Sequence, residues 1–500
     1  MLKLTVAIVV AGVVSIARGP AALASDHTAA SDPPDILLVI TDDQRWDTLE
    51  FMPQVQQRIV DRGMTFTNAF VVNALCCPSR ASILTGLYSH STGVYRQAPP
   101  YGRFESFDDA STLATWLDAL GYRTGYFGKY IDGGQHFLLT GYVPPGWDEW
   151  AVFVHAAYYD YKLSVNGAIE SYGQEPEDYS THVLAARAAD FIRTSDNNPL
   201  FMVFAPAAPH APGTPAPEDA DAPVLPETWR PPNYNEADVS DKPPWLRAIP
   251  PLDEEGRAAL DAARIDQIRS LSAVDRSVAL VLDELRAAGR LRRTLIVYTS
   301  DNGLAWGEHR WNKKEVPYEE SIRVPFVVRY DPLVATAAVE DRIALNIDIA
   351  PTIARLTGVE EIEADGRSLL PLLSRDARRW RHDFLIEHLQ GSNPVTTYCA
   401  VRSERFLYVR YRDGFTELYD LETDPFELTN LSGVAAFQQT ESALVGRLQE
   451  LCQPPPPAVP PIFKNGGFSA VFVALIALVG ATLLGGLLLA LRFRKRRASS

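Results

Sequence analysis

The sequence predicts an α/β protein with a mostly parallel sheet flanked by helices, followed by a smaller α+β subdomain. Three short apolar, β-branched runs, Asp35–Thr41, Leu200–Ala205 and Thr294–Thr299, are typical of strands buried on both faces of a parallel sheet. A long helical pattern at Arg257–Ala288 lies between the last two runs. Because ligands of such folds bind beyond the carboxyl ends of the strands, we expect the functional site there.

Shorter patterns predict the elements between these strands. Met52–Arg62 and Thr112–Leu120 have helical periodicity, and each is followed by a glycine, a frequent residue at helix ends. Met64–Val71 is a further strand candidate. The stretch Pro206–Pro251 contains 13 of the 37 prolines and is too long for a simple connection. We expect it to form a loop that lies over the site.

The pattern changes after about residue 375. A closing helix is expected at Ala435–Leu451, and the short strand candidates before it are Phe384–Glu387, Tyr398–Arg402, Phe406–Arg410 and Phe415–Tyr419. This change predicts a main domain at 33–375 and a C-terminal α+β subdomain at 376–452. Cys399 and Cys452 in that subdomain could pair in an oxidising compartment.

Both ends of the chain have the composition of targeting segments. Residues 1–24 combine a lysine, an uncharged apolar run and Ala22-Leu23-Ala24, and predict a signal peptide; the alternative is an uncleaved N-terminal anchor. Residues 453–467 are a proline-rich linker, and 468–491 have no charge and the length of a transmembrane helix. The basic residues of 492–500 predict a cytoplasmic tail. We expect a single-pass protein of the cell membrane whose folded part is extracytoplasmic.

The charge of the folded part disfavours nucleic acid as a partner. The whole chain has a net charge of −15. When the basic residues of 1–24 and 492–500 are left out, the chain has 40 basic and 62 acidic side chains. The folded part therefore carries a net charge of about −22. Such a surface repels polyanions, so an anionic substrate needs a local basic pocket.

Oxygen-bearing side chains follow two of the predicted buried strands. Asp42 and Asp43 come directly after the first strand, and Asp301 and Asn302 follow the strand at Thr294–Thr299. For either pair alone, a turn or cap is the simpler interpretation. Two such pairs at strand ends favour a hard divalent cation, and the lack of a His or Cys cluster favours Ca²⁺ or Mg²⁺ over zinc.

The most specific motif is Cys76-Cys77-Pro78-Ser79-Arg80. A lone cysteine is usually an inert core residue. Here the residues from Pro78 onward resemble a helix start, which places Cys76 near the positive end of the helix dipole. Arg80 could bind an anion with two hydrogen bonds. The motif therefore predicts a nucleophile or an anion site.

This motif, with Ala81-Ser82-Ile83-Leu84-Thr85-Gly86 after it, resembles the signature of the type I sulfatases, in which the first cysteine is oxidised to formylglycine. The resemblance implies an alkaline-phosphatase-like fold and a catalytic sulfatase domain at 33–375. Within the family it is greatest to N-acetylglucosamine-6-sulfatases and heparan endosulfatases. The other stretches that carry it are Thr41-Asp42-Asp43-Gln44, Phe127-Gly128-Lys129-Tyr130, Val143-Pro144-Pro145-Gly146-Trp147, Ala208-Pro209-His210-Ala211-Pro212, Tyr298-Thr299-Ser300-Asp301-Asn302-Gly303 and Leu418-Tyr419-Asp420-Leu421-Glu422.

The resemblance also implies roles for individual residues. One Ca²⁺ ion would be bound by the formylglycine from Cys76 and by Asp42, Asp43, Asp301 and Asn302. The catalytic residues would be the formylglycine itself, Arg80 and Lys129, which hold it and neutralise the sulfate, and His210 and Lys314, which contact the ester and help the leaving group depart. A formylglycine-generating enzyme of the host would be a required partner.

Two departures from the family pattern concern the substrate. Many sulfatases carry a histidine where this chain has Ile131, and the glucosamine-6-sulfatase branch carries an asparagine where this chain has Asp132. The chain also lacks the long basic insert of the endosulfatases, which favours an exo-acting enzyme or a small sulfated substrate. Two alternatives remain: a phosphodiesterase or phosphonate hydrolase that uses the same site, and a non-catalytic binding ectodomain.

Overall fold

The computed structural model describes residues 33–133, 136, 140–222 and 228–458. The predicted signal peptide, the linker from residue 459 onward, the predicted membrane helix at 468–491 and the tail lie outside these residues. Among the described residues, no helix combines the length and apolar character that a membrane crossing requires.

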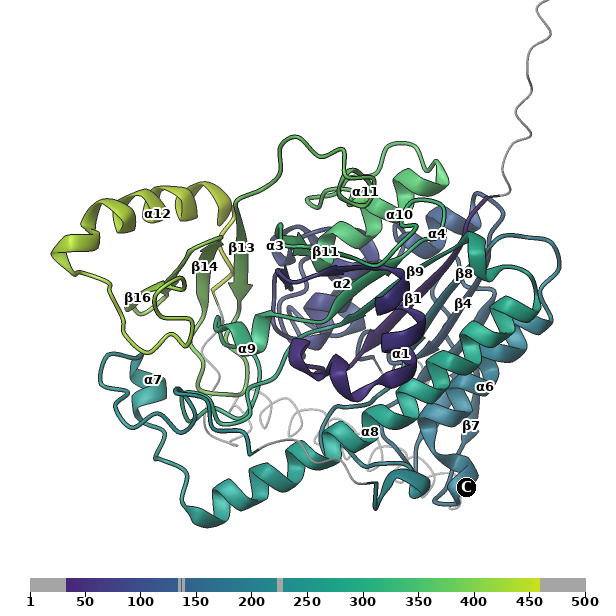
Figure 1. Cartoon of the computed structure of the whole chain (residues 1–500), viewed down its shortest axis with the longest axis horizontal. Helices are drawn as coiled ribbons and strands as arrows, with labels where there is room; N and C mark the ends of the chain where they lie inside the picture. The colour runs from purple at the N-terminus through teal and green to yellow at the C-terminus, as the bar shows by residue number, and fades with distance from the viewer. Residues whose placement is uncertain (1–32, 134–135, 137–139, 223–227, 459–500) are drawn as a thin grey trace, which may run out of the picture.

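A ten-stranded mixed sheet is the centre of the molecule (Figure 1). Its strand order is β11-β2-β10-β9-β1-β8-β4-β5-β6-β7, and the five strands from β9 to β5 run parallel. The bounds are β1 Asp35–Thr41, β2 Met64–Phe66, β4 Arg123–Gly128, β5 Glu149–Phe153, β6 Lys162–Val165, β7 Ala168–Ser171, β8 Leu200–Ala205, β9 Thr294–Ser300, β10 Phe326–Arg329 and β11 Ala338–Glu340.

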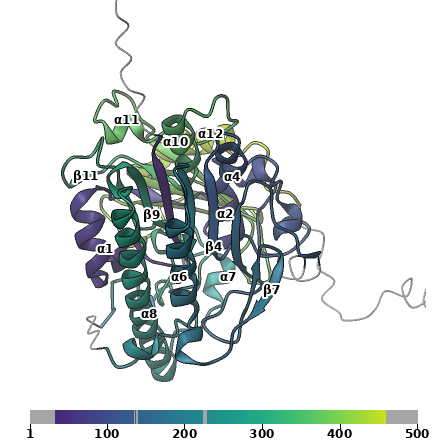
Figure 2. The same cartoon turned by 90° about the vertical axis from the view of Figure 1, so that its right-hand side faces the viewer.

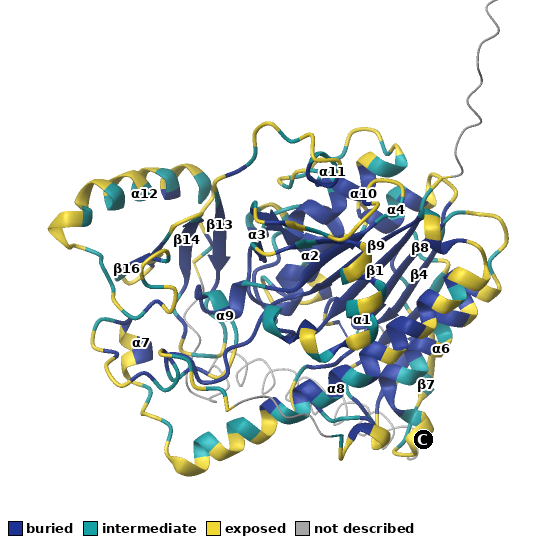
Figure 3. Ribbon diagram, in the orientation of Figure 1, coloured by how far each residue is buried: buried dark blue, intermediate teal, exposed yellow. Residues whose placement is uncertain are grey.

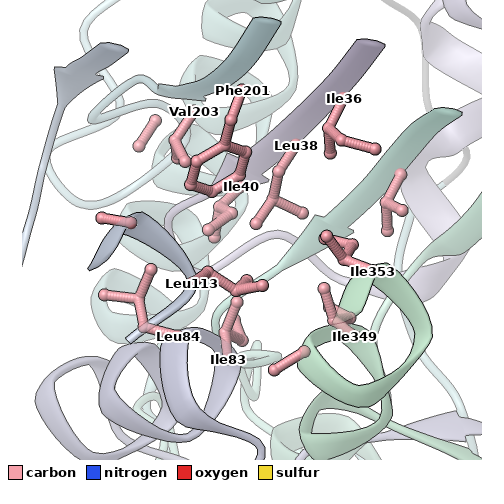
Figure 4. Close-up of a cluster of buried hydrophobic side chains, with 14 of the residues drawn as sticks. Ile36, Leu38, Ile40, Ile83, Leu84, Leu113, Phe201, Val203, Ile349 and Ile353 are labelled. Atoms are coloured by element: carbon pink, nitrogen blue, oxygen red, sulfur yellow. The ribbon is translucent and has the colours of Figure 1, made fainter. Parts of the chain in front are cut away.

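Helices cover both faces of this sheet because every central strand is apolar on both sides. Ile36, Leu38 and Ile40 of β1 point to the face covered by α2, α4 and α10, as Figure 4 shows. Leu37 and Val39 point to the opposite face, where α1, α6 and α8 pack (Figure 2). The bounds are α1 Pro53–Arg58, α2 Cys76–Thr85, α3 Ser89–Thr92, α4 Leu113–Asp118, α6 Ser180–Arg193, α7 Pro244–Arg247, α8 Glu254–Ala287, α9 Glu319–Ile322, α10 Ile349–Thr357 and α11 Leu370–Leu373.

A four-stranded antiparallel sheet and one helix form the C-terminal subdomain, at the left of Figure 1. One face of this sheet packs against α12 and the other against the loops of the main domain, so its strands are buried (Figure 3). Cys399 and Cys452 form a disulfide that joins β14 to the end of α12, a pairing that the sequence left open. The bounds are β13 Asp383–His388, β14 Tyr398–Ser403, β15 Phe406–Tyr411, β16 Thr416–Asp420 and α12 Gln438–Leu451; a two-stranded sheet pairs β3 Ala69–Phe70 with β12 Ala344–Leu345.

The predicted main strands and the long helix are confirmed, and three predictions need adjustment. The strand predicted at Met64–Val71 is split into β2 and β3, because its two halves pair with different partners, β10 and β12. The helix predicted at Met52–Arg62 ends at Arg58 and continues as a single 3₁₀ turn. The proline-rich stretch Pro206–Pro251 contains the short helix α7 and a 3₁₀ turn. Of its described residues, those that line the cavity described below all lie in its first part, before residue 215.

Candidate active site

The two acidic strand ends lie side by side. Strands β1 and β9 are neighbours in parallel register with Thr41 opposite Ser300, so the residues after each strand leave the same edge of the sheet. The backbone N–H of Asp43 donates to Asp301 Oδ1 at 3.1 Å, and Asn302 Nδ2 donates to Asp43 Oδ1 at 2.7 Å. Asp42, Asp43, Asp301 and Asn302 are all buried. Residues separated by more than 250 positions thus form one compact oxygen cluster.

Cys76 lies against this cluster at the start of α2. Leu75 is the N-cap residue of this helix and makes no side-chain hydrogen bond to it. Cys76 is the first helical residue and therefore lies at the positive end of the helix dipole. Its Sγ lies 3.8 Å from Asp42 Oδ1 and 2.7 Å from Lys314 Nζ. The side chain is 1% exposed. The motif that the sequence singled out therefore reaches the strand-end acids.

Three basic side chains balance the three carboxylates. Arg80 Nε donates to Asp301 Oδ2 at 2.8 Å, and Lys129 Nζ donates to Asp42 Oδ2 at 2.7 Å. Lys314 Nζ forms an ion pair with Asp43. His210, the remaining predicted catalytic residue, also lies here: its Nε2 is 3.7 Å from Asp43 Oδ2.

A glycine allows Lys129 to reach the site. Gly128, the last residue of β4, has a φ of +130°, and a Cβ there would lie 1.9 Å from the carbonyl oxygen of Ala205 on the neighbouring strand. Glycine alone fits this close approach. The backbone carbonyl of Lys129 then accepts from Arg80 Nη1 at 2.5 Å. These contacts fix both basic side chains on the acid cluster.

The pKa values of the cluster reflect burial and pairing. Burial alone would raise the pKa of Asp42, but Lys129 and His210 lower it below its usual value. The same competition, with Lys314 as the main cation, lowers the pKa of Asp43. Burial raises the pKa of the Cys76 thiol to about 12, although Lys129 and Lys314 act against it. The carboxylates are therefore ionised at neutral pH, whereas an unmodified Cys76 is a neutral thiol and a weak nucleophile.

The donor set fits a hard divalent cation. Single ligand atoms of Asp42, Cys76 and Asp301 lie within 4.8 Å of one another, and the same holds for Asp42, Asp43 and His210. Asn302 Oδ1 is buried and has no hydrogen-bond partner among the described residues. A buried oxygen without a partner is costly, and a cation would satisfy it. The mainly oxygen donors suit Ca²⁺ or Mg²⁺ better than zinc.

A cavity of about 700 Å³ opens beside the cluster. Asp42, Lys129 and His210 form its inner wall, and loop residues form the rest. Its volume lies in the range of small-molecule sites. Asp132 lines the cavity as well, so the departure from the family pattern at that position faces the substrate space.

The sequence reasoning missed several residues of this cavity. Gln97, Arg103, His155 and Tyr158 line it but belong to no motif and lie in irregular loops. Gln97 Oε1 also accepts from the backbone N–H of Cys77 at 3.2 Å. No periodicity marks such residues, and only the position of the flanking motifs could have drawn attention to them.

The comparisons with known proteins agree with the motif. The sequence matches the Sulfatase family over residues 34–359 and the C-terminal region of N-sulphoglucosamine sulphohydrolase over residues 307–454. The N-acetylglucosamine-6-sulfatase of Homo sapiens is 31% identical over 491 residues, which cover 87% of each chain. The extracellular sulfatase SULF-1 homolog of Drosophila melanogaster is 34% identical over 377 residues, 72% of this chain. The chain spans only 33% of that relative and 55% of a similar one from Caenorhabditis elegans.

Solved structures have the same fold. A protein in complex with its substrate D-glucosamine-2-N,6-O-disulfate superposes with a TM-score of 0.70 at 25% identity, covering 84% of this chain and 98% of the other. A phosphonate monoester hydrolase of Agrobacterium radiobacter shares the fold with a TM-score of 0.68 at 22% identity, covering 84% of this chain and 95% of the other. The family match spans well over half of the sequence and includes the motif at Cys76. The chain therefore belongs to the sulfatase family of sulfuric ester hydrolases.

Proposed function

We propose that this protein hydrolyses sulfate esters of amino sugars through a formylglycine made from Cys76 and one bound Ca²⁺ ion. The observation that carries the proposal is the convergence of Cys76, at a helix start, with the strand-end oxygen cluster and three basic side chains. The similarity to N-acetylglucosamine-6-sulfatases supports an amino-sugar substrate. The ion would be held by position 76 together with Asp42, Asp43, Asp301 and Asn302.

When present, the formylglycine would supply the nucleophilic oxygen, and the Ca²⁺ ion would withdraw electron density from the sulfate. The chain's own residues bind and orient the ester. Arg80, Lys129 and Lys314 surround position 76 with positive charge, which stabilises the charge on the sulfuryl oxygens. Because Arg80 and Lys129 are buried and the side chain of Lys314 is only 12% exposed, their effect on that charge is stronger than in water.

We assign to His210 the protonation of the departing alcohol. Its ring lies at the cavity wall, half exposed, and Nδ1 lies 2.8 Å from the carbonyl oxygen of Ala211. With Nδ1–H donated to that carbonyl, the imidazolium can release its other proton from Nε2 towards the cavity. Lys314 is the second candidate acid, because its ammonium group lies between Cys76 and Asp43.

The sequence beyond the described residues adds a location to this proposal. We place the catalytic domain and its C-terminal subdomain outside the cytoplasm, tethered by residues 468–491. The disulfide between Cys399 and Cys452 supports an oxidising compartment. A host formylglycine-generating enzyme would then be needed as a partner.

Mass spectrometry and activity assays test the proposal. The mass of the Cys76 peptide from the native host should correspond to the aldehyde or its hydrate. Sulfate release from N-acetylglucosamine-6-sulfate should exceed turnover of an aryl phosphodiester at matched pH, and chelation should abolish it until Ca²⁺ is restored. Cys76→Ala should lose all activity, whereas the matched control Cys77→Ala should retain it. Predominant diester turnover, or activity in Cys76→Ala, would overturn the proposal.

A further inference from the structure

A second group of metal-ligating side chains lies apart from the active site. His309 belongs to the loop after β9, Glu320 to α9, and Glu427 to the loop between β16 and α12. One ligand atom from each lies within 4.8 Å of the others. The residues are 1%, 7% and 0% exposed. We call these three residues, together with Asn233, the inner cluster.

The carboxylates of the inner cluster lack basic partners. Nearby acids are paired: Arg45 Nη1 lies 2.8 Å from Glu308, and Arg402 Nε lies 2.8 Å from Glu319. Glu320 and Glu427 have no ion pair with any described residue. Burial raises the pKa of both, and the negative charge of neighbouring glutamates raises it further.

Three buried oxygens of the inner cluster also lack hydrogen-bond donors. Within the described part of the chain, Glu320 Oε2, Glu427 Oε1 and Asn233 Oδ1 have no partner. Asn233 Nδ2 donates to Glu320 Oε1 at 2.9 Å and lies 3.3 Å from His309 Nε2. The carboxamide of Asn233 therefore lies between two of the metal-ligating residues. Three such oxygens at one buried position indicate a missing positive partner.

The histidine has the orientation of a metal ligand. His309 Nδ1 lies 2.6 Å from Glu236 Oε2, and this carboxylate accepts a hydrogen bond from Nδ1–H. Nε2, which faces the inner cluster, then carries the lone pair. A carboxylate that fixes the tautomer of a histidine in this way is the usual support of a metal-ligating imidazole.

We propose that the inner cluster binds a structural Zn²⁺ ion. His309 Nε2, Glu320 and Glu427 offer one nitrogen and two oxygens. Asn233 would add a third oxygen if its carboxamide turned over, so that Oδ1 took the place that Nδ2 now has beside His309. The set then has the four donors that zinc takes in structural sites. The imidazole favours zinc over Ca²⁺, which prefers oxygen alone. The glutamate side chains would rotate inward, because the present separations of up to 4.8 Å exceed the spacing of zinc ligands.

Such an ion would join three separate parts of the chain. It would tie Glu427 of the C-terminal subdomain to the proline-rich stretch at Asn233 and to the loop that carries Lys314. This inference does not depend on the proposed sulfatase activity, because neither Cys76 nor the strand-end acids take part.

The zinc content of protein that is purified in its folded state, without a refolding step, tests the proposal. After exposure to Zn²⁺ and gel filtration, the wild-type protein should carry one more equivalent of zinc than Glu427→Gln. Glu236→Gln, which keeps all four ligands but removes the carboxylate behind His309, should weaken zinc binding by about 10- to 100-fold. Glu422→Gln, an exposed charge in the same subdomain, is the matched control and should bind zinc as the wild type does.

A measurement on the wild-type protein covers the case in which a variant does not fold. Crystals soaked in Zn²⁺ should show an anomalous difference peak between His309 and Glu427. Equal zinc content in the wild type and a folded Glu427→Gln, or no peak at this position, would overturn the proposal.

Discussion

Histidine 388 should make the stability of the protein fall in mild acid. The residue ends β13 and is 1% exposed, and its ring stacks on Tyr398 with centroids 5.2 Å apart. Burial lowers its pKa from 6.5 to about 4, because the imidazolium loses its hydration inside the protein. The unfolded chain therefore binds a proton at a higher pH than the folded protein does.

The sign and size of the effect follow from this difference. A depressed pKa contributes stability that is fully present above pH 6.5 and is lost as the pH falls towards 4. The complete shift of about 2.5 units corresponds to roughly 3 kcal/mol, of which about 2 kcal/mol is already lost at pH 5. This is a substantial part of the free energy of unfolding of a typical protein, about 5–15 kcal/mol.

The test compares the wild-type protein with His388→Phe, which keeps an aromatic ring on Tyr398 but cannot titrate. Urea unfolding at pH 8 and pH 5 gives the loss of unfolding free energy for each protein. The loss in the wild type should exceed that in His388→Phe by about 2 kcal/mol, since the other titrating groups are common to both. An equal loss in both proteins would refute the reasoning.

Three further predictions concern charge and cross-linking. Lys129→Met should lower kcat/KM for sulfate ester hydrolysis by about 10²- to 10³-fold, since a buried cation over Asp42 is lost; unchanged initial rates would contradict its role. Asp35→Asn should lower the unfolding free energy by about 3–5 kcal/mol in urea titrations, because two arginines lose their buried carboxylate; a change below 1 kcal/mol would contradict this. Cys452→Ser should lower the stability by about 4 kcal/mol, since the disulfide to Cys399 closes a loop with a sequence separation of 53; equal urea midpoints with and without the bond would argue against it.

The sequence could predict the three neighbouring strands at the centre of the sheet, but it missed β4 beside them and the strands β6 and β7 at one edge. Strands β1, β8 and β9 are buried on both faces, so each is a continuous apolar run with clear ends. Strand β4 contains glycines at Gly125 and Gly128, which are typical of turns but are required here by close packing against β8 and α6. Strands β6 and β7 are short and partly exposed, and their pairing depends on tertiary contacts that have no local pattern.

The same distinction applies to the site. The acid cluster could be predicted because adjacent parallel strands must bring Asp42 and Asp301 to one edge. The positions of Lys129, His210 and Lys314 relative to the cluster rested on the family resemblance, and their contacts come from long loops. The cavity wall at Arg103 and the inner cluster could not be predicted, since residues from several separate loops meet there only in the folded chain.

The burial of Cys76 limits when a modifying enzyme could reach its thiol. Its side chain is 1% exposed and lies beneath Lys314, a residue that arrives from more than 200 positions further along the chain. In the folded protein the thiol is therefore enclosed, and its backbone is held as the first residue of helix α2. Under the proposed function, conversion of Cys76 would have to precede the packing of Lys314 and of the second half of the sheet against it. On the same proposal, a chain that folds before the conversion would keep an unmodified thiol at position 76.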